Sequence, residues 1–148
     1  MSSTHTSLHY HLVWSTKDRR PLIAADWLPR LHAWMGGNVR MQGGVALCVG
    51  GVADHVHAIV GLRATHCLAD VMRVLKGESS EWVHRELGVA DFEWQEGYGA
   101  FTVSPNQIEK VRHYVEHQAE HHRTKTFQEE YVELLKLAGV EYDERYLW

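Results

Sequence analysis

The sequence predicts one α+β domain in which an antiparallel β-sheet is covered by helices. Three observations predict this fold class. Apolar and polar residues alternate over Leu8–Ser15, as they do in a half-buried strand. Apolar residues recur at helical spacing over Leu68–Leu87 and again after Pro105. The chain of 148 residues is long enough for one domain with a core, and no linker or repeat divides it, so a single domain over residues 1–148 is expected.

Five elements are expected in the first half of the chain. In order, they are a strand over Leu8–Ser15, a charged turn over Thr16–Pro21, a helix over Ala24–Met35, a strand over Met41–Gly51 and a strand over Val52–Leu62. Gly36 and Gly37 are expected to end the helix, because glycine is common just past a helix C-terminus. Gly50 and Gly51 predict a tight hairpin between the last two strands.

The second half is expected to be mostly helical. Its elements are a helix over Leu68–Leu87 closed by Gly88, strand-like pieces at Phe92–Trp94 and Ala100–Val103, a helix from Pro105 to about His122 capped by Ser104, and a helix over Thr126–Leu137 closed by Gly139. The resulting order, β-α-β-β-α-β-α-α, is that of a ferredoxin-like or RRM-like fold with a sheet of four to five strands. The last short strands leave a sheet edge with which another chain could pair.

The composition is that of an ordinary globular protein, with 45% hydrophobic and 23% charged residues. No apolar run reaches membrane-spanning length and residues 1–6 lack the features of a signal peptide, so a cytoplasmic protein without a membrane partner is expected. The formal net charge of −4 comes from the acidic helix and tail over residues 126–148, where six acids outnumber the bases. The rest of the chain is close to neutral, which permits nucleic-acid binding without suggesting it.

Two histidines flank one apolar residue in the strand expected at Val52–Leu62. Side chains alternate along a strand, so His55 and His57 lie on the same face, about 7 Å apart along the backbone. Burying two imidazoles is unfavourable unless they find partners, and a divalent cation would be one. The alternative is a chance pairing, because the chain has twelve histidines and a second pair, His9 and His11, lies in the first strand.

A row of polar residues follows the apolar stripe of the helix expected after Pro105. Tyr114 and Gln118 are four residues apart on one helix face, and His121 and His122 extend that face by a turn. The row is either a solvated face or the second half of the histidine site. In the second case, Gln118 offers a neutral oxygen as a third metal ligand, and Tyr114 offers a phenol oxygen as a nucleophile. Attack on a phosphodiester would store the bond energy in a phosphotyrosine, so that the strand can later be rejoined.

Four blocks of sequence resemble the HUH-superfamily single-tyrosine transposases, that is, the insertion-sequence-200-like and REP-associated tyrosine transposases. The blocks are His11–Pro21, which looks like the family's opening strand and basic turn; the histidine pair; Leu75–Ser80, which looks like its lysine-glycine helix; and the tyrosine followed four residues later by glutamine. Their order and spacing cover nearly the whole chain and are far more specific than any single block.

The resemblance implies metal-dependent cleavage and rejoining of single-stranded DNA with hairpin (palindromic) ends. It implies His55, His57 and Gln118 as ligands of Mg²⁺ or Mn²⁺, and Tyr114 as the nucleophile that forms a 5′-phosphotyrosine link. It also implies a homodimer, in which the tyrosine acts either at its own histidine pair or at the partner's. Two features depart from the family pattern: the acidic C-terminal region and the histidine-rich stretch at residues 117–122, which leaves open a further metal ligand.

Candidate phosphate contacts lie in the charged turn and on the helix after the histidine strand; they are Lys17, Arg19, Arg20, Arg73 and Lys76. The alternative for each is an ordinary solvated charge. For His11, a hydrogen-bonded position in the sheet is favoured over a role at the site. Two other functions stay open for the whole protein. One is a non-catalytic, domesticated nucleic-acid-binding module of the same fold, and the other is a small metal-binding protein that holds zinc or nickel.

Overall fold

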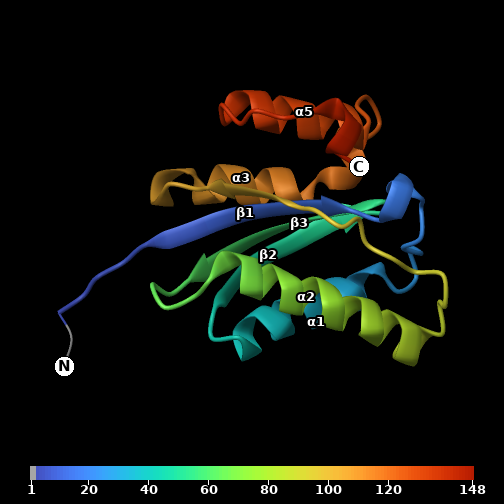
Figure 1. Ribbon diagram of the computed structural model, residues 1–148, viewed down its shortest axis with the longest axis horizontal. Helices are drawn as coiled ribbons and strands as arrows, with labels where there is room; N and C mark the ends of the chain where they lie inside the picture. The colour runs from blue at the N-terminus through green and yellow to red at the C-terminus, as the bar shows by residue number, and fades with distance from the viewer. Residues whose placement is uncertain (1–2) are drawn as a thin grey trace.

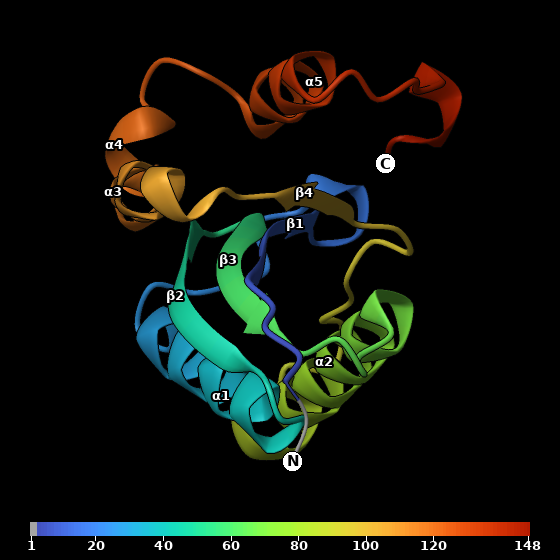
Figure 2. The same cartoon turned by 90° about the vertical axis from the view of Figure 1, so that its left-hand side faces the viewer.

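Figures 1 and 2 show the computed structural model of the protein, which describes residues 3–148. A four-stranded sheet lies between two helical layers. Helices α1 (Leu28–Met41) and α2 (Leu68–Trp82) cover one face. Helices α3 (Ile108–Glu116), α4 (Gln118–His121) and α5 (Phe127–Leu137) lie over the other. The expected α+β class and single domain are confirmed.

The strands of the sheet stand in the order β2-β3-β1-β4, and all neighbours are antiparallel. Their bounds are Leu8–Ser15 for β1, Val45–Val52 for β2, His55–Leu62 for β3 and Gly99–Thr102 for β4. This is the ferredoxin-like order expected from the sequence. The histidine-bearing strand β3 is therefore central, and its register pairs Val13 of β1 with His57.

The expectation that Gly36 and Gly37 end the first helix is wrong, because α1 continues through both to Met41. Gly36 is buried, and a Cβ on it would lie 3.6 Å from Ala46 Cβ of β2. This is an ordinary van der Waals distance, so alanine would also fit there. The packing of α1 on the sheet outweighs the low intrinsic helix propensity of its two glycines.

The expectation of a hairpin turn at Gly50 and Gly51 is also wrong. Both residues lie within β2, and the turn that joins β2 to β3 is formed by Ala53 and Asp54. A Cβ on Gly50 would overlap the backbone carbonyl of Val115 in α3. Gly50 is thus a site of close approach between a helix and the sheet.

In the middle of the chain, the structure contains the expected helix but lacks one of the two expected strands. The helix over Leu68–Leu87 is confirmed as α2 followed by a π-helical turn, and Gly88 closes it with φ 69°. Phe92–Trp94 is not a strand, since only an isolated bridge between Thr16 and Trp94 forms there. The side chain of Phe92 is buried in the core instead.

The helix expected from Pro105 to about His122 is broken. It begins as a 3₁₀ turn at Pro105–Gln107, and Ser104 makes no side-chain capping bond. It is interrupted at His117, where φ is −111° and ψ is 33°, so α3 and α4 are separate. The last helix is confirmed as α5, which begins after Thr126, whose hydroxyl accepts a hydrogen bond from the backbone N–H of Glu129 at 3.2 Å.

The apolar core lies mainly between the sheet and helices α1 and α2, and it includes Leu12, Trp14, Val56 and Val60. A smaller apolar cluster fastens α5 to the opposite face; its buried members are Val13, Phe127, Tyr131 and Leu135. Within residues 3–148, no helix is both long enough and apolar enough to cross a membrane.

Candidate active site

The sheet face beneath α3, α4 and α5 carries a cluster of buried histidines. His55 and His57 are fully buried, and their ring centroids are 5.2 Å apart on the same face, as strand alternation predicts. His11 of β1 is stacked on His57, and its Nε2 lies 2.7 Å from His57 Nδ1. His11 is therefore the hydrogen-bonded sheet residue that was expected, and it is also a direct neighbour of the site.

The outer ring nitrogens of these histidines are each held by a polar group. His55 Nδ1 lies 2.7 Å from Asp54 Oδ1, in the turn between β2 and β3. His122 Nδ1 donates to the backbone carbonyl of Lys125 at 2.7 Å. The Nδ1 atom of His57 is held in the same way by its contact with His11 Nε2. Contacts of this kind fix the tautomer and orientation of metal-binding histidines, here with Nε2 facing the interior of the cluster.

Helices α3 and α4 bring the expected tyrosine and glutamine over the histidines. Gln118 is 1% exposed, and its Oε1 lies 2.9 Å from His55 Nε2. The Tyr114 ring packs edge-on against His57 with a centroid separation of 5.6 Å. Gly50, the register partner of His57, sets this approach because it lets α3 lie directly on the backbone of β2. Tyr114 thus lies at the histidine pair of its own chain.

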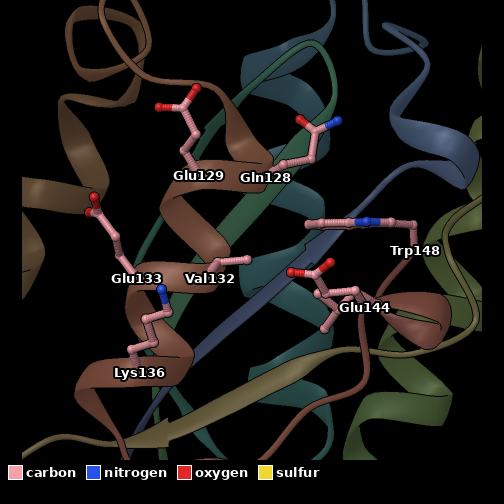
Figure 3. Close-up of a pocket in the computed structure, with 8 residues that line it drawn as sticks. Gln128, Glu129, Val132, Glu133, Lys136, Glu144 and Trp148 are labelled. Carbon is pink, nitrogen blue, oxygen red and sulfur yellow. The ribbon is translucent and has the colours of Figure 1, made fainter.

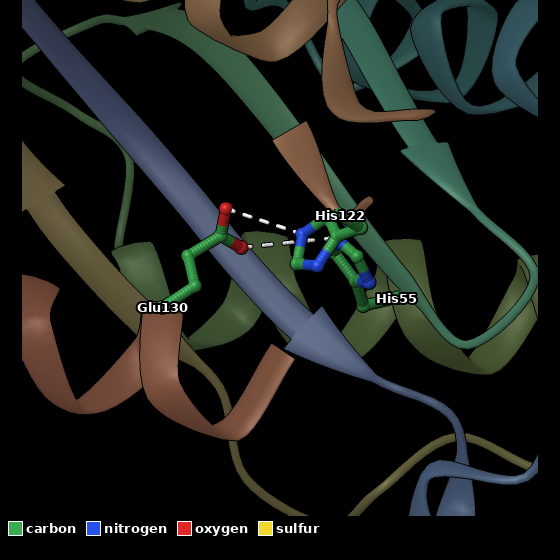
Figure 4. Close-up of side chains that lie close together, drawn as sticks. All are labelled: His55, His122 and Glu130. Atoms are coloured by element: carbon green, nitrogen blue, oxygen red, sulfur yellow. Dashed lines mark ion pairs between the residues drawn. The ribbon is translucent and has the colours of Figure 1, made fainter. Parts of the chain in front are cut away.

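Helix α5 adds a buried carboxylate that the sequence pattern alone did not identify. Glu130 is 2% exposed, and its Oε1 lies 2.9 Å from His57 Nε2 and 3.7 Å from His55 Nε2. Its Oε2 accepts a hydrogen bond from the Tyr114 hydroxyl and lies 3.2 Å from His122 Nε2. Figure 4 shows Glu130 pointing from α5 toward His55 and His122.

One sequence signal could have found this residue. Glu130 lies three residues after Phe127 and four before Leu134, so it is a charged residue on the apolar stripe of an amphipathic helix. Charged side chains are almost never fully buried unless they have a partner. Glutamate at such a position therefore indicates a buried partner for the carboxylate.

Burial and hydrogen bonding set the charges of the cluster. Burial lowers the pKa of His57 to about 4 and, together with the charge of His57, lowers that of His11 to about 3. Burial alone would raise the pKa of Glu130, but hydrogen bonds from His122 and His57 outweigh it and hold that pKa below its ordinary value. Burial and the hydrogen bond to Glu130 raise the pKa of the Tyr114 phenol above its ordinary value. These effects favour the ionised form of Glu130 and the protonated form of Tyr114, while the hydrogen bond to Glu130 raises the pKa of His122 against the effect of its burial.

The donor atoms of the cluster fit one divalent metal ion. The atoms offered by His55, His122 and Glu130 all lie within 4.8 Å of one another. Gln118 Oε1 is 2.9 Å from His55 Nε2 and 3.0 Å from His122 Nε2. Neighbouring ligands of an octahedral ion, each about 2.1 Å from it, are about 3 Å apart. The two separations from Gln118 match this spacing, and the donor atoms of His55, His122 and Glu130 are close enough together for one ion to reach all three, whereas His57 is not part of this set.

Three of the candidate phosphate contacts form exposed ion pairs. Lys17 pairs with Glu93 and Arg20 with Asp91, both at 3.2 Å, and Arg73 pairs more loosely with an acid one turn away. Exposed pairs contribute at most about 1 kcal/mol, so these cations are available to exchange their partner for a phosphate. Their binding to DNA stays a prediction.

The other two candidates have internal partners. Lys76 Nζ donates to the backbone carbonyls of Gln95, Glu96 and Gly97 at 2.6, 2.9 and 2.7 Å, and burial lowers its pKa to about 8. The Arg19 guanidinium lies 4.7 Å from the ring centroid of Trp148. Lys76 therefore stabilises the segment before β4, and a phosphate would have to displace those carbonyls to reach it.

One surface cavity opens onto Tyr114, and a larger one lies away from the histidine cluster. A cavity of about 470 Å³ is lined by Tyr114 and His121 together with Lys110, His113 and His117, and it gives access to the tyrosine from solvent. A larger groove of about 550 Å³ runs along α5 and the C-terminal tail, and Figure 3 shows its carboxylates and Trp148. No member of the histidine cluster lines this groove. The cavity of about 470 Å³ therefore opens onto Tyr114, and a further cavity of about 340 Å³ reaches His122 and Asp54.

Known proteins share sequence and fold with this chain. Residues 4–118 match the family described as "Transposase IS200 like". The ISDra2 transposase TnpA of Deinococcus radiodurans is 25% identical over 121 residues, which are 75% of this chain and 84% of that protein.

Two solved structures share the fold. The crystal structure of a putative transposase from Deinococcus radiodurans R1 has a TM-score of 0.64 and 22% identity, over 80% of this chain and 95% of that one. The structure of a REP-associated tyrosine transposase bound to a REP hairpin has a TM-score of 0.52 and 15% identity, over 78% of this chain and 68% of that one.

The family match contains three of the four expected site residues inside its span and ends at the fourth, Gln118. His122 and Glu130 lie beyond it. Because the matched segment covers most of the chain, including the whole sheet and helix α3, the protein belongs to the family of IS200-like transposases.

Proposed function

We propose that this protein cleaves and rejoins single-stranded DNA through a covalent 5′-phosphotyrosine intermediate at Tyr114. The observation that carries the proposal is the meeting of this phenol with the histidine pair. Tyr114 packs against His57 at a centroid separation of 5.6 Å, and Gln118 approaches His55 to 2.9 Å. A nucleophile, two imidazoles and an amide oxygen in one buried cluster are what phosphoryl transfer to tyrosine requires.

The residues of the chain have distinct roles in this reaction. The Tyr114 hydroxyl gives up its proton as its oxygen attacks the phosphorus, the bond from phosphorus to the 3′ oxygen breaks, and the leaving 3′ oxygen takes up a proton. Rejoining is the reverse, in which a 3′ hydroxyl attacks the phosphotyrosine and frees Tyr114. Glu130 accepts the hydrogen bond of the attacking hydroxyl and orients it. Asp54 keeps His55 oriented through its Nδ1 contact.

The metal would be Mg²⁺ or Mn²⁺, held by His55, His57 and Gln118. When bound, such an ion polarises a phosphate oxygen and lowers the pKa of a nearby phenol. This last effect matters here, because burial raises the pKa of Tyr114 in the metal-free cluster.

The DNA substrate would be a single strand with a hairpin end. One structural neighbour is a REP-associated tyrosine transposase bound to a REP hairpin, which supports this choice. The exposed cations Lys17, Arg20 and Arg73 are the candidate phosphate contacts, because only surface ion pairs hold them. We also propose a homodimer, since β4 is an edge strand of only four residues with a free side for pairing. Each subunit would use its own Tyr114.

The test is covalent capture of a labelled single-stranded hairpin DNA in the presence of Mn²⁺. Wild-type protein should give a DNA adduct that survives denaturing electrophoresis. Tyr114→Phe should give none, while its unfolding midpoint changes little, because only one hydroxyl is removed. Tyr142→Phe, a tyrosine outside the cluster, is the matched control and should form the adduct normally. An adduct on the Tyr114→Phe protein would refute the assignment.

A second candidate function, a non-catalytic nucleic-acid-binding module, is favoured by the enclosure of the site. His55 and His57 have no exposed surface, and the Tyr114 hydroxyl is engaged by Glu130. The same experiment separates the two functions. Wild-type protein that binds the hairpin but forms no adduct and leaves the strand intact with Mn²⁺ would support the module.

A further inference from the structure

We propose that Glu130 and His122 are additional ligands of the active-site metal, so that helix α5 is part of the metal centre. This proposal rests on the proposed function, which places a divalent ion at His55, His57 and Gln118. It extends that ligand set to residues beyond the segment that matches the family, which ends at Gln118.

The positions of the donor atoms support this extension. His55, His122 and Glu130 form the set whose donor atoms lie within 4.8 Å of one another among the described residues, and two of the three lie beyond the matched segment. Glu130 also bridges this set to His57 through the 2.9 Å contact with its Nε2. An ion bound by the histidine pair and Gln118 would therefore lie within reach of the Glu130 carboxylate.

The charge of Glu130 is the second argument. The carboxylate is 2% exposed, and its ion-pair partners within residues 3–148 are all histidines: His55, His57, His121 and His122. Neither lysine nor arginine pairs with it. A buried charge is costly unless it is paired or coordinates a metal. A dication bound in the cluster would place a permanent positive charge beside this buried carboxylate.

The third argument is that both residues are held in place. His122 Nδ1 is fixed by the Lys125 carbonyl, which directs Nε2 toward the cluster. Helix α5 is anchored beside the site, because Phe127 stacks on the His55 ring with a centroid separation of 4.5 Å. Together with the histidine pair and Gln118, these two residues would offer the ion three imidazole nitrogens, an amide oxygen and a carboxylate; His57 lies outside the 4.8 Å set and contacts it through Glu130.

The ligand set also indicates which ion is preferred. Three imidazoles with one carboxylate and one amide oxygen suit Mn²⁺ better than Mg²⁺, which favours oxygen ligands and retains several waters. Binding of the ion would hold α5 against the sheet, since it would join residues of β3 to His122, which follows α4, and to Glu130 within α5.

Calorimetric titration of metal-free protein with Mn²⁺ tests the proposal without any activity measurement. Glu130→Gln, which keeps the size of the side chain and removes its charge, should weaken Mn²⁺ binding by about tenfold or more. His122→Ala should weaken it to a similar degree. Glu133→Gln on the exposed side of α5 and His84→Ala in the π-helical turn after α2 are the matched controls, and both should bind as wild type does. Equal or tighter binding by Glu130→Gln would overturn the proposal, since tighter binding would identify Glu130 as a plug that competes with the ion.

His57→Ala distinguishes failure of this proposal from failure of the proposed function. Loss of binding in His57→Ala with normal binding in Glu130→Gln would refute the α5 ligands alone. No Mn²⁺ binding by the wild-type protein would refute both. Normal binding in His57→Ala with loss in Glu130→Gln would support the α5 ligands and remove His57 from the set.

Hydrogen exchange of the wild-type protein provides a test that does not depend on the folding of any variant. Addition of Mn²⁺ should slow amide exchange in α5 and in the segment from His122 to Thr126, while α1 on the far side of the sheet serves as the internal control. Unchanged or faster exchange in α5 on Mn²⁺ binding would overturn the proposal.

Discussion

The two faces of the sheet have opposite chemistry although they belong to the same strands. Toward α1 and α2, β1 and β3 present Leu12, Trp14 and Val56, which are fully buried among apolar side chains. Toward α3–α5, the alternate residues of the same strands include His55 and His57, equally buried but among polar groups.

The difference shows how this domain separates stability from chemistry. The apolar face stabilises the fold without any specific partner, because burial of apolar area is non-directional. The polar face is stable only if each imidazole and carboxylate finds its particular partner. The second face therefore depends on the accurate placement of α3–α5, and the first does not.

The largest expected effect is a loss of unfolding free energy, and it should differ between a residue of the apolar face and a residue of the polar face. Trp14→Ala should lower the free energy of unfolding by about 3–5 kcal/mol, since it removes a large, fully buried side chain from the core. His57→Ala should cost less, about 1–3 kcal/mol, which reflects the polar partners left without a hydrogen bond. Urea unfolding of metal-free protein measures both. An equal or larger loss for His57→Ala would show that the polar face is also a main source of stability.

The second-largest expected effect is a loss of stability on acidification, which acts on the polar face. The pKa of His57 is about 4 and that of His11 about 3 in the folded protein, against 6.5 in the unfolded chain. The unfolded chain thus binds more protons between pH 6.5 and 4, so the free energy of unfolding should fall across this window, by on the order of 1–3 kcal/mol. His122, whose pKa is raised by Glu130 against the effect of burial, opposes part of this loss.

Urea unfolding between pH 7 and pH 5 in the presence of EDTA checks the acid effect. His57→Ala should flatten the dependence, because one of the depressed groups is gone. A slope that is the same in wild type and His57→Ala would assign the acid sensitivity to other residues, such as His32 on the α1 side, whose burial lowers its pKa to about 4.

The third prediction tests the close packing of α3 on the sheet. Gly50→Ala should destabilise the protein by about 1–3 kcal/mol and reduce DNA cleavage, because the new Cβ would push α3 and Tyr114 away from His57. Gly61→Ala in β3 is the control, since the nearest atoms to its Cβ would be side-chain atoms of His9, at 3.4 Å, and Val45, at 3.8 Å. Unfolding and adduct assays compare the stability and the DNA cleavage of the two variants. Equal values for Gly50→Ala and Gly61→Ala would contradict the prediction.

The smallest expected effect is a gain in stability from a substitution in α2, on the apolar face of the sheet. Gly77 lies in α2 and a Cβ there would have no neighbour within 4 Å, so the protein has no steric need for glycine. Gly77→Ala should stabilise the metal-free protein by about 0.5–1 kcal/mol through the greater helix propensity of alanine. Thermal unfolding gives the answer, and a loss of stability would indicate a packing constraint that the structure does not contain.

The order of the elements could be predicted from local patterns, but several of their boundaries could not. Alternation in β1 and the apolar stripe of α2 are short-range signals, and both were interpreted correctly. The role of Gly50 depends on its close approach to α3, which is distant in sequence, and so the local pattern predicts a turn there instead. The break at His117, next to the buried Gln118, is likewise not indicated by helical periodicity.

The sequence by itself determined that His55 and His57 share one face, since the period of a strand is two residues. It also placed Tyr114 and Gln118 one turn apart. Only the tertiary structure decided that these two groups meet, that Asp54 and His11 orient the histidines, and that Glu130 enters the cluster from α5. The physical reason is that local periodicity sets which way a side chain points, whereas the partner it reaches depends on how closely distant elements pack.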